Sequence, residues 1–376
     1  MISSAFVYFF LLATIATSFN FIEKNTNLKF FNYVPAVVII YAFSMLLAGL
    51  GVFERNEEIL KIYSNTKTNL LPAMLFLMLL QIDFRHFVKL GRSLLISYVL
   101  AVLSIAFGFV VVALIFSFDT KSASAFGALA GSWMGGTANM VAVGSALDVP
   151  DEAFGYALIV DSVNYTFWVM LMLFIVPFAK VFNKFTASND VVASLHEIGC
   201  ACNLGAKKYW LLIIIALVAS TVAQVLATQF MIINTTTTVI ILATLFGVIG
   251  SFTKLRELNG TSEVATTMLY IIVALIGSQA IFENFSGVGV YVFAGFVILL
   301  IHALIMVIGA KIFKLDLFSI AVASLSNIGG VASAPILAAA YNKSLVSVGV
   351  LMAIMGYLIG TFGGLAVGTL LQSLAK

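Results

Sequence analysis

The feature that most constrains the fold is a succession of apolar segments, each about as long as a membrane is thick. A run of about twenty apolar residues suffices for one helical crossing. Only 9% of the 376 residues are charged and 62% are hydrophobic, far from the composition of a soluble domain. The sequence therefore predicts an all-α polytopic membrane protein. We expect segments at about 3–20, 34–52, 69–83, 92–117, 123–147, 152–180, 208–230, 233–251, 264–281, 287–313, 317–341 and 344–374.

Two of these segments are interrupted by glycine and polar residues. Gly127–Gly144 reads GALAGSWMGGTANMVAVG, and a looser copy, SLSNIGGVASAP, occupies Ser324–Pro335. A helix that only faces lipid would not collect such residues at its centre. Matching interruptions in the two halves of a membrane protein indicate the central binding site of a transporter.

The sequence also indicates an internal duplication. Met74-Leu75-Phe76 pairs with Met268-Leu269-Tyr270, which begins 194 residues later. Gly135-Gly136 pairs with Gly329-Gly330 at the same offset of 194 residues. A shared offset in two segments favours a repeat. We therefore expect a first repeat at 1–182, a cytoplasmic linker at 183–207 and a second repeat at 208–376.

The parity of the crossings and the loop charges predict the topology. Inverted repeats need an odd number of crossings, which six segments provide only if the glycine-rich segment of each half dips in and returns. With both termini outside, most of the 19 Lys and Arg residues then lie in the cytoplasm, as the positive-inside rule requires. We expect a bacterial inner membrane protein with two inverted repeats, each of about five transmembrane helices plus a re-entrant hairpin, although loop charge alone leaves a broken crossing helix open. The expected cytoplasmic residues are Lys24, Lys29, Arg85, Lys89, Arg92, Lys180, Lys184, Lys207, Lys208, Lys254, Arg256, Lys311, Lys314 and Lys343.

Each interruption could form a binding site. A helix that restarts after a break directs N–H groups without helical partners at a ligand, and such ends bind carboxylates or phosphates. Glycines permit a tight turn, while hydroxyl and amide groups add contacts to a substrate or to Na⁺. The alternative is that small residues merely allow close helix packing. The candidate residues are Gly135, Gly136, Thr137, Asn139, Ser324, Ser326, Asn327, Gly329, Gly330 and Ser333.

One acidic residue lies deep within a predicted helix of the first half. Asp161 is about ten residues from the start of segment 152–180, and Asn164, three residues later, shares its helix face. A carboxylate at that depth is costly and indicates a functional site. The pair could hold Na⁺, or Asp161 could carry a proton; the alternative is a hydrogen-bonded structural aspartate.

Other features indicate structure rather than chemistry. Gly356, Gly360, Gly364 and Gly368 recur every four residues in the last segment. This stripe is typical of close helix packing, either against a hairpin or as a sliding surface. Cys200 and Cys202 lie in the linker and are expected to be reduced thiols. We do not expect them to form a metal site with His196. His302 is expected to be a packed, hydrogen-bonded residue. No enzyme motif is present, so we expect no enzyme and no cofactor beyond a possible Na⁺.

Two stretches carry a resemblance to a known family. GSWMGGTANMVAVGSAL, at 131–147, and DEAFGYALIVDSVNYTFW, at 151–168, resemble the YjcL-like family of bacterial membrane proteins, a domain-of-unknown-function family. That family looks like a member of the cation/proton antiporter and anion transporter superfamily, which includes bile-acid/sodium and sodium/glutamate symporters. The likeness covers nearly the whole chain. It implies inverted repeats, a mobile core holding the broken segments, a second domain that often dimerises, and elevator-like movement.

The resemblance also implies roles for particular residues. Gly135, Gly136 and Asn139 would form a binding tip with Gly329 and Gly330 as its partner. Asp161 and Asn164 fall where the antiporters place an acidic pair, but here the second acid is absent.

These observations favour a secondary active transporter of a small organic anion, coupled to Na⁺ or H⁺ and embedded as a homodimer in the lipid bilayer, with no nucleic acid partner. The alternatives are a monovalent cation/proton antiporter that uses Asp161, and a channel or membrane sensor.

Overall fold

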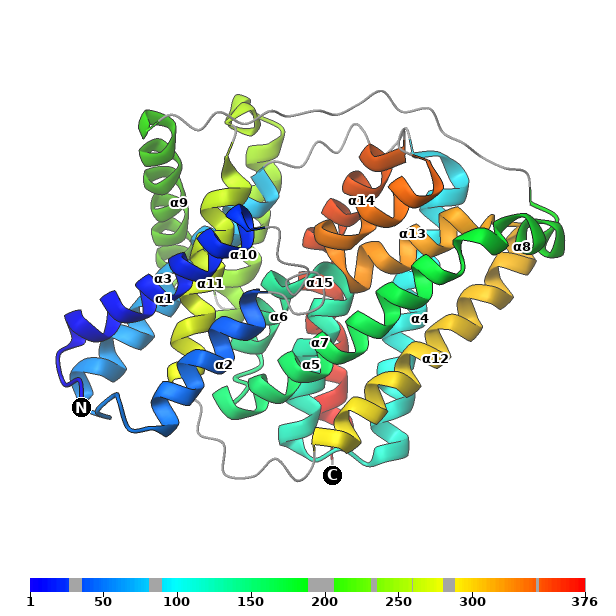
Figure 1. The fold of residues 1–376 in the computed structure, drawn as a ribbon. Coiled ribbons are helices and arrows are strands. Elements are labelled where there is room, and N and C mark those ends of the chain that lie inside the picture. The colour runs from blue at the N-terminus through cyan, green and yellow to red at the C-terminus, as the bar shows by residue number, and fades with distance from the viewer. Residues whose placement is uncertain are drawn as a thin grey trace. The chain divides into compact units, whose positions relative to one another are not determined.

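The protein is helical, as the apolar segments predict. The computed structural model describes residues 1–26, 36–80, 90–188, 206–230, 235–258, 260–279, 288–342 and 345–375. These residues form no strand, only an isolated bridge between Ile2 and Phe53. The helices (Figure 1) are α1 Ala5–Asn25, α2 Ala36–Gly49, α3 Glu57–Leu80, α4 Gly91–Phe116, α5 Thr120–Gly135, α6 Thr137–Ala146, α7 Asp151–Phe174, η3 Val176–Phe178, α8 Ala179–Thr186, α9 Ala206–Ala227, α10 Thr235–Ser251, η4 Lys254–Glu257, α11 Thr261–Gln279, α12 Val288–Phe313, α13 Leu317–Ile328, α14 Gly330–Tyr341 and α15 Val346–Leu374.

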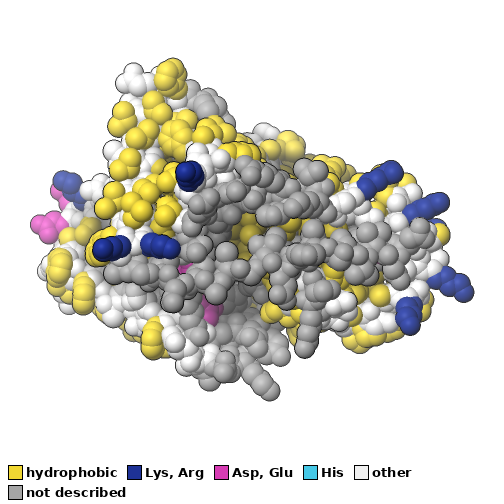
Figure 2. Space-filling model, turned by 90° about the horizontal axis from the view of Figure 1, so that it is seen from above, with side chains coloured by type: hydrophobic (Ala, Val, Ile, Leu, Met, Phe, Trp, Pro, Cys, Tyr) yellow, Lys and Arg dark blue, Asp and Glu magenta, His cyan; other side chains and the backbone are white. Residues whose placement is uncertain are grey.

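Several of the helices are suited to a membrane. Among the described residues, 7 helices are long and apolar enough to cross one: α1, α4, α7, α9, α11, α12 and α15. Hydrophobic side chains are exposed over much of the described surface in Figure 2. Extended apolar patches mark sites of contact with a membrane or another protein. The protein is therefore an integral membrane protein.

Most predicted segments match helices, but the third helix begins earlier than the sequence predicts. The predicted segment is 69–83, whereas α3 begins at Glu57. Glu57 and Glu58 lie in its first turn, where carboxylates interact favourably with the helix dipole. One side of this polar extension packs inward, since Ile59 is buried. A search for apolar runs misses such an extension because its outer face is polar.

The chain divides into two compact units, and each unit takes segments from both halves of the sequence. Unit 1 consists of Met1–Gln81, Asp148–Ser162 and Cys202–Val288, and unit 2 of Ile82–Leu147, Val163–Ala201 and Gly289–Lys376. The two motifs that indicated a duplication respect this division. The Met-Leu-aromatic motifs lie on α3 and α11 in unit 1, and both glycine pairs lie in unit 2.

Unit 1 is packed through glycines and tyrosines. A Cβ on Gly247 of α10 would lie 2.6 Å from Cβ of Leu79 on α3, so these two helices are in close contact. Tyr41 of α2 donates a hydrogen bond to the carbonyl of Asp151 at 2.9 Å, and Tyr63 donates to its carboxylate at 2.9 Å. These bonds hold the start of α7 within unit 1.

In unit 2, α5 and α6 form a hairpin. A Cβ on Gly131 of α5 would lie 2.9 Å from Val143 Cγ2 on α6, and one on Gly127 would lie 2.7 Å from the side chain of Leu147. In a single straight helix, residues twelve apart in sequence would be separated by about 18 Å. The chain therefore turns back between α5 and α6.

The second glycine-rich segment also forms a hairpin. Phe318 at the start of α13 and Tyr341 at the end of α14 have ring centroids 5.3 Å apart. These residues lie at opposite ends of the sequence segment, so α14 returns along α13 (Figure 1). Both polar interruptions thus mark the turns of helical hairpins.

Each hairpin begins with the same cap. Asp119 accepts a hydrogen bond from the backbone N–H of Ser122 at 2.8 Å, and Asp316 accepts one from that of Ser319 at 2.9 Å. A side chain that caps a helix in this way satisfies one of its first N–H groups. The shared Asp-x-x-Ser pattern is a further likeness between the two halves.

The predicted glycine stripe packs against the first hairpin. A Cβ on Gly364 would lie 2.6 Å from Cα of Gly131, and one on Gly360 would lie 2.6 Å from Cα of Gly135. The backbones of α15 and α5 are therefore in direct contact, which only glycine allows. This part of the glycine pattern has the packing role that the sequence predicted.

Candidate functional site

The first break lies at Gly136, between α5 and α6. Its φ of +88° is a backbone conformation that favours glycine. Asn139, buried in the first turn of α6, donates hydrogen bonds to the carbonyls of Gly135 at 2.8 Å and Gly356 at 3.3 Å. Its Oδ1 accepts one from Thr361 Oγ1 at 2.6 Å. The Asn139 amide therefore caps the last carbonyl of α5 and ties the break to α15.

The second break, at Gly329-Gly330, is less fully satisfied. Gly330 has φ +60°. Asn327 donates to the Ala323 carbonyl at 2.8 Å, but its Oδ1 has no hydrogen-bond partner within the described chain, and neither has the hydroxyl of Ser326 or Ser333. All three side chains are buried. Buried polar atoms without partners are few in folded proteins and call for an explanation.

Helix α7 lies against this second break. A Cβ on Gly329 would lie 2.7 Å from Cε2 of Tyr165 and 1.9 Å from the hydroxyl of Ser333. The neighbour of Tyr165, Asn164, is fully buried and donates to the carbonyl of Val292 at 3.1 Å. Its Oδ1 also finds no partner among the described residues. Four predicted site residues thus carry unpaired oxygen atoms on the segments that meet here: Asn164, Ser326, Asn327 and Ser333.

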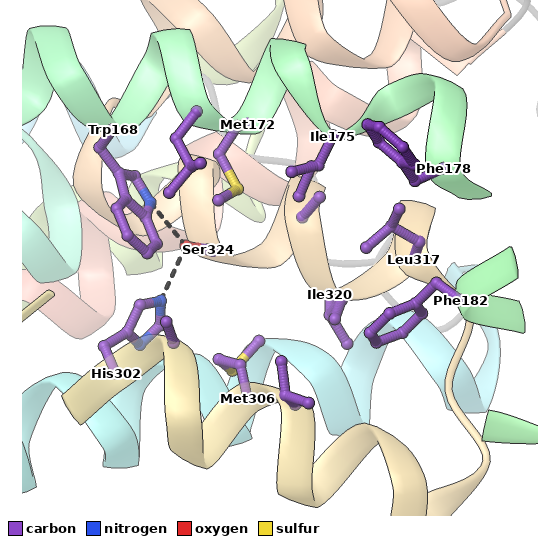
Figure 3. Close-up of a pocket in the computed structure, with 14 residues that line it drawn as sticks. Trp168, Met172, Ile175, Phe178, Phe182, His302, Met306, Leu317, Ile320 and Ser324 are labelled. Atoms are coloured by element: carbon purple, nitrogen blue, oxygen red, sulfur yellow. Dashed lines mark hydrogen bonds between the residues drawn. The ribbon is translucent and has the colours of Figure 1, made fainter. Parts of the chain in front are cut away.

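Ser324 has a different environment from that of its neighbours. Its Oγ accepts a hydrogen bond from Trp168 Nε1 at 2.9 Å and lies 2.7 Å from His302 Nε2 (Figure 3). Nδ1 of His302 lies 2.6 Å from Ser104 Oγ, which donates to the carbonyl of Ala101 at 2.9 Å. These directions assign the proton of a neutral imidazole to Nδ1. His302 is a packed, hydrogen-bonded residue, as the sequence predicted, and the Ser324 hydroxyl is committed to it.

The remaining candidates lie elsewhere on the same elements. Thr137 is half-buried at the start of α6. Asp161 is half-buried on α7, three residues before Asn164, and has an interaction of its own, so it is not a free carboxylate. No group of three or more His, Cys, Asp or Glu side chains suited to a metal occurs in the described part of the chain. His196, Cys200 and Cys202 lie outside the described residues.

Two residues at the first break are not among the site residues predicted from the sequence. Thr361 supplies the hydrogen bond to Asn139, and its only signal was a polar residue within the glycine stripe. Tyr98 is fully buried, and its hydroxyl has no partner in the described structure. The hydroxyl of Tyr98 lies 3.5 Å from where a Cβ on Gly356 would be. A tyrosine in the apolar segment 92–117 was the available signal.

The fold and these residues define a class: an integral membrane protein whose unit 2 contains two helical hairpins that turn at glycine breaks. The comparisons agree with this class. Residues 9–374 match the family described as "Protein of unknown function (DUF819)", and the chain belongs to that family. It is 23% identical over 384 residues to the protein named "Uncharacterized membrane protein YjcL" of Bacillus subtilis (strain 168), covering 94% of this chain and 93% of that protein.

Proposed function

We propose that the protein is a secondary active transporter that moves a small organic anion together with Na⁺ or H⁺. The proposed binding site lies at the two hairpin turns. The observation that carries the proposal is the group of buried, unpaired oxygen atoms at the second break.

The chemistry of these atoms favours a cation. Amide and hydroxyl oxygens are hard ligands of the kind that bind Na⁺ where backbone and side chains leave them free. Leaving Asn327 Oδ1 and the Ser326 and Ser333 hydroxyls buried and unpaired would cost about 1–3 kcal/mol each. A bound cation would remove that cost.

The anion would be bound by backbone and by the cation, without a basic side chain. Neither 122–147 nor 317–341 contains Lys or Arg. The first N–H groups of α6 and α14 point away from their helices at the breaks and carry partial positive charge. This arrangement suits a carboxylate or another anion of low charge and disfavours a large polyanion.

Unit 2 contains both hairpins, which supports a role for it as the moving core in an elevator-like cycle. Unit 1 would then be the static part and the site of homodimerisation. We place the protein in the bacterial inner membrane with both termini outside, on the strength of the loop charges.

The test uses Ser326→Ala/Ser333→Ala. Because neither hydroxyl has a hydrogen-bond partner among the described residues, the double variant should be at least as stable as the wild type without Na⁺. Thermal unfolding of the purified protein with NaCl, and with KCl at the same ionic strength, should show Na⁺-dependent stabilisation in the wild type that the double variant loses. Ser145→Ala is the matched control, since Ser145, in the last turn of α6, has a buried hydroxyl without a partner in the described part of the chain.

The transport arm measures uptake of radiolabelled small carboxylates into proteoliposomes with imposed Na⁺ or pH gradients. Saturable uptake driven by one gradient, and lost in the double variant, is the expected result. Absence of any effect of Na⁺ and pH on both stability and uptake would refute coupled transport.

The second candidate is cation/proton antiport through Asp161, supported by the position of this half-buried carboxylate ten residues into α7. In that case Na⁺ and H⁺ would compete, and Asp161→Asn would abolish Na⁺-driven proton movement in vesicles. Symport of an anion would instead make anion binding tighter when Na⁺ is present.

A further inference from the structure

Unit 2 contains an apolar cavity that the proposed transport site does not use. It has a volume of about 290 Å³ and lies between α7, η3, α8, α12 and α13 (Figure 3). Trp168, His302 and Ser324 line one end, where the hydrogen bonds described above satisfy their polar atoms. The rest of the lining is apolar, with Met172, Met306 and Ile320 among it.

The cavity is accessible from the apolar surface. Three of its lining residues are substantially exposed, Leu171 by 43%, Phe178 by 52% and Val307 by 40%. An apolar cavity of about 150 Å³ stays dry and binds small hydrocarbons. This cavity is larger and its rim is hydrophobic, so its natural occupant is a hydrocarbon chain.

Basic side chains lie just beyond the other end of the cavity, away from Trp168, His302 and Ser324. Lys180 and Lys184 on α8, and Lys311 and Lys314 at and after the end of α12, are all exposed. Asp316 is the only acidic residue within 174–188 and 303–325, and it is buried as the cap of α13. The local charge is therefore positive and suits an anionic headgroup.

Helix α8 connects the cavity to the lysines. Phe178 and Phe182 line the cavity, whereas Lys180 and Lys184 lie two residues further along, on the opposite helix face. The helix is fixed in place, because the backbone N–H of Leu317 donates to Asn183 Oδ1 at 2.9 Å. Lys311 also donates to the carbonyl of Phe185 and lies 4.6 Å from its ring centroid. A short helix with one apolar and one basic face is typical of a membrane interface.

We propose that this cavity is a binding site for an anionic phospholipid. One acyl chain occupies the cavity up to the hydrogen-bonded cluster of Trp168, His302 and Ser324. The phosphate lies at the lysines of α8 and the end of α12. The site is separate from the glycine breaks, and it stands whether or not the protein transports an anion.

The cavity arm of the test uses full-length protein in detergent, with native mass spectrometry after addition of dioleoyl phosphatidylglycerol. Ala303 lines the cavity, so the ring in Ala303→Phe should exclude part of the acyl chain. Loss of about two buried methylene groups is enough to weaken lipid retention about tenfold. Leu304→Phe adds a ring at the next position on α12, outside the cavity, and should retain the lipid. Equal retention by Ala303→Phe and the wild type would overturn the proposal.

The charge arm compares headgroups and lysines. Phosphatidylglycerol should bind more tightly than phosphatidylcholine of the same chains, and Lys180→Ala/Lys184→Ala should reduce that preference about tenfold. Lys207→Ala/Lys208→Ala removes the same charge from α9 and should leave the preference unchanged. Equal binding of both lipids would overturn the proposal. It would also be overturned if inorganic phosphate alone shifted the melting temperature as much as phosphatidylglycerol does, or if the mass spectra showed a second protein bound in place of lipid.

Discussion

The close backbone contact between Gly360 of α15 and Gly135 of α5 allows one quantitative prediction. In Gly360→Ala, the new Cβ would lie 2.6 Å from Cα of Gly135, 2.8 Å from its nitrogen and 2.7 Å from Nδ2 of Asn139. Two of these atoms are backbone and cannot rotate away, so α15 must move off α5. Overpacking of this kind costs about 1–3 kcal/mol. The movement would also stretch the hydrogen bond from Asn139 to Gly356, which is already 3.3 Å long.

The same substitution also has a stabilising part. Alanine is favoured over glycine inside a helix by about 1 kcal/mol. Overpacking less this gain leaves a loss of about 0–2 kcal/mol for Gly360→Ala. Weakening of the Asn139 hydrogen bond adds up to about 1 kcal/mol, so we expect a net loss of stability. Thermal unfolding of the purified protein in detergent should show a lower melting temperature.

Gly363→Ala is the matched control, because it lies on the same helix one turn away. Its Cβ would lie 2.8 Å from the sulfur of Met134, a flexible side chain that can move at little cost. This variant should be as stable as the wild type or slightly more stable. Equal melting temperatures for Gly360→Ala and Gly363→Ala would refute the direct backbone contact between α15 and α5.

Three further predictions concern the hydrogen bonds of individual residues. Thr361→Val leaves Asn139 Oδ1 buried without its donor and should destabilise the protein by about 1–3 kcal/mol, measured by thermal unfolding. The hydroxyl and N–H of Ser122 hold the pKa of the Asp119 carboxyl below its usual range. The stability that this carboxylate contributes is therefore present above the unfolded pKa of about 3.9. That stability is lost as the pH falls through the lower pKa of the folded state. Unfolding of Asp119→Asn should therefore depend less steeply on acid pH, and an unchanged profile would contradict the cap. His302→Leu removes the partner of two buried hydroxyls and should lower the melting temperature by more than Leu304→Ala at the exposed neighbouring position.

Much of the fold could be predicted because length and hydrophobicity are local properties. A run such as Gly91–Phe116 is long and apolar enough to identify a helix without any knowledge of its neighbours. The breaks could be predicted for the same reason, since Gly136 and Gly330 adopt positive φ values that a local sequence signal can specify.

What the sequence could not show was which surfaces meet. The glycines at 356–368 indicated a small-residue face, but not that Gly360 contacts Gly135, because helix periodicity defines a face and not its partner. For the same reason, the sequence could not predict the hydrogen bond between Thr361 and Asn139. Nor could it predict that Ser324 is hydrogen-bonded to His302 whereas the Ser326 hydroxyl has no partner in the described structure. Inverted symmetry, the Na⁺ site and the membrane orientation remain predictions from the offset, the oxygen atoms and the loop charges.

The glycine contact between α5 and α15 has a translational repeat. Gly127, Gly131 and Gly135 approach Gly368, Gly364 and Gly360 in turn, and the carbonyl of Gly356 lies one step further on. A slide of four residues, about 6 Å along the axis, would bring each glycine of α5 opposite the next glycine of α15. The glycine spacing alone therefore does not distinguish the observed register of α15 on α5 from the shifted one. The hydrogen bonds of Asn139 to Gly356 and Thr361 form in the observed register, so they help to select it.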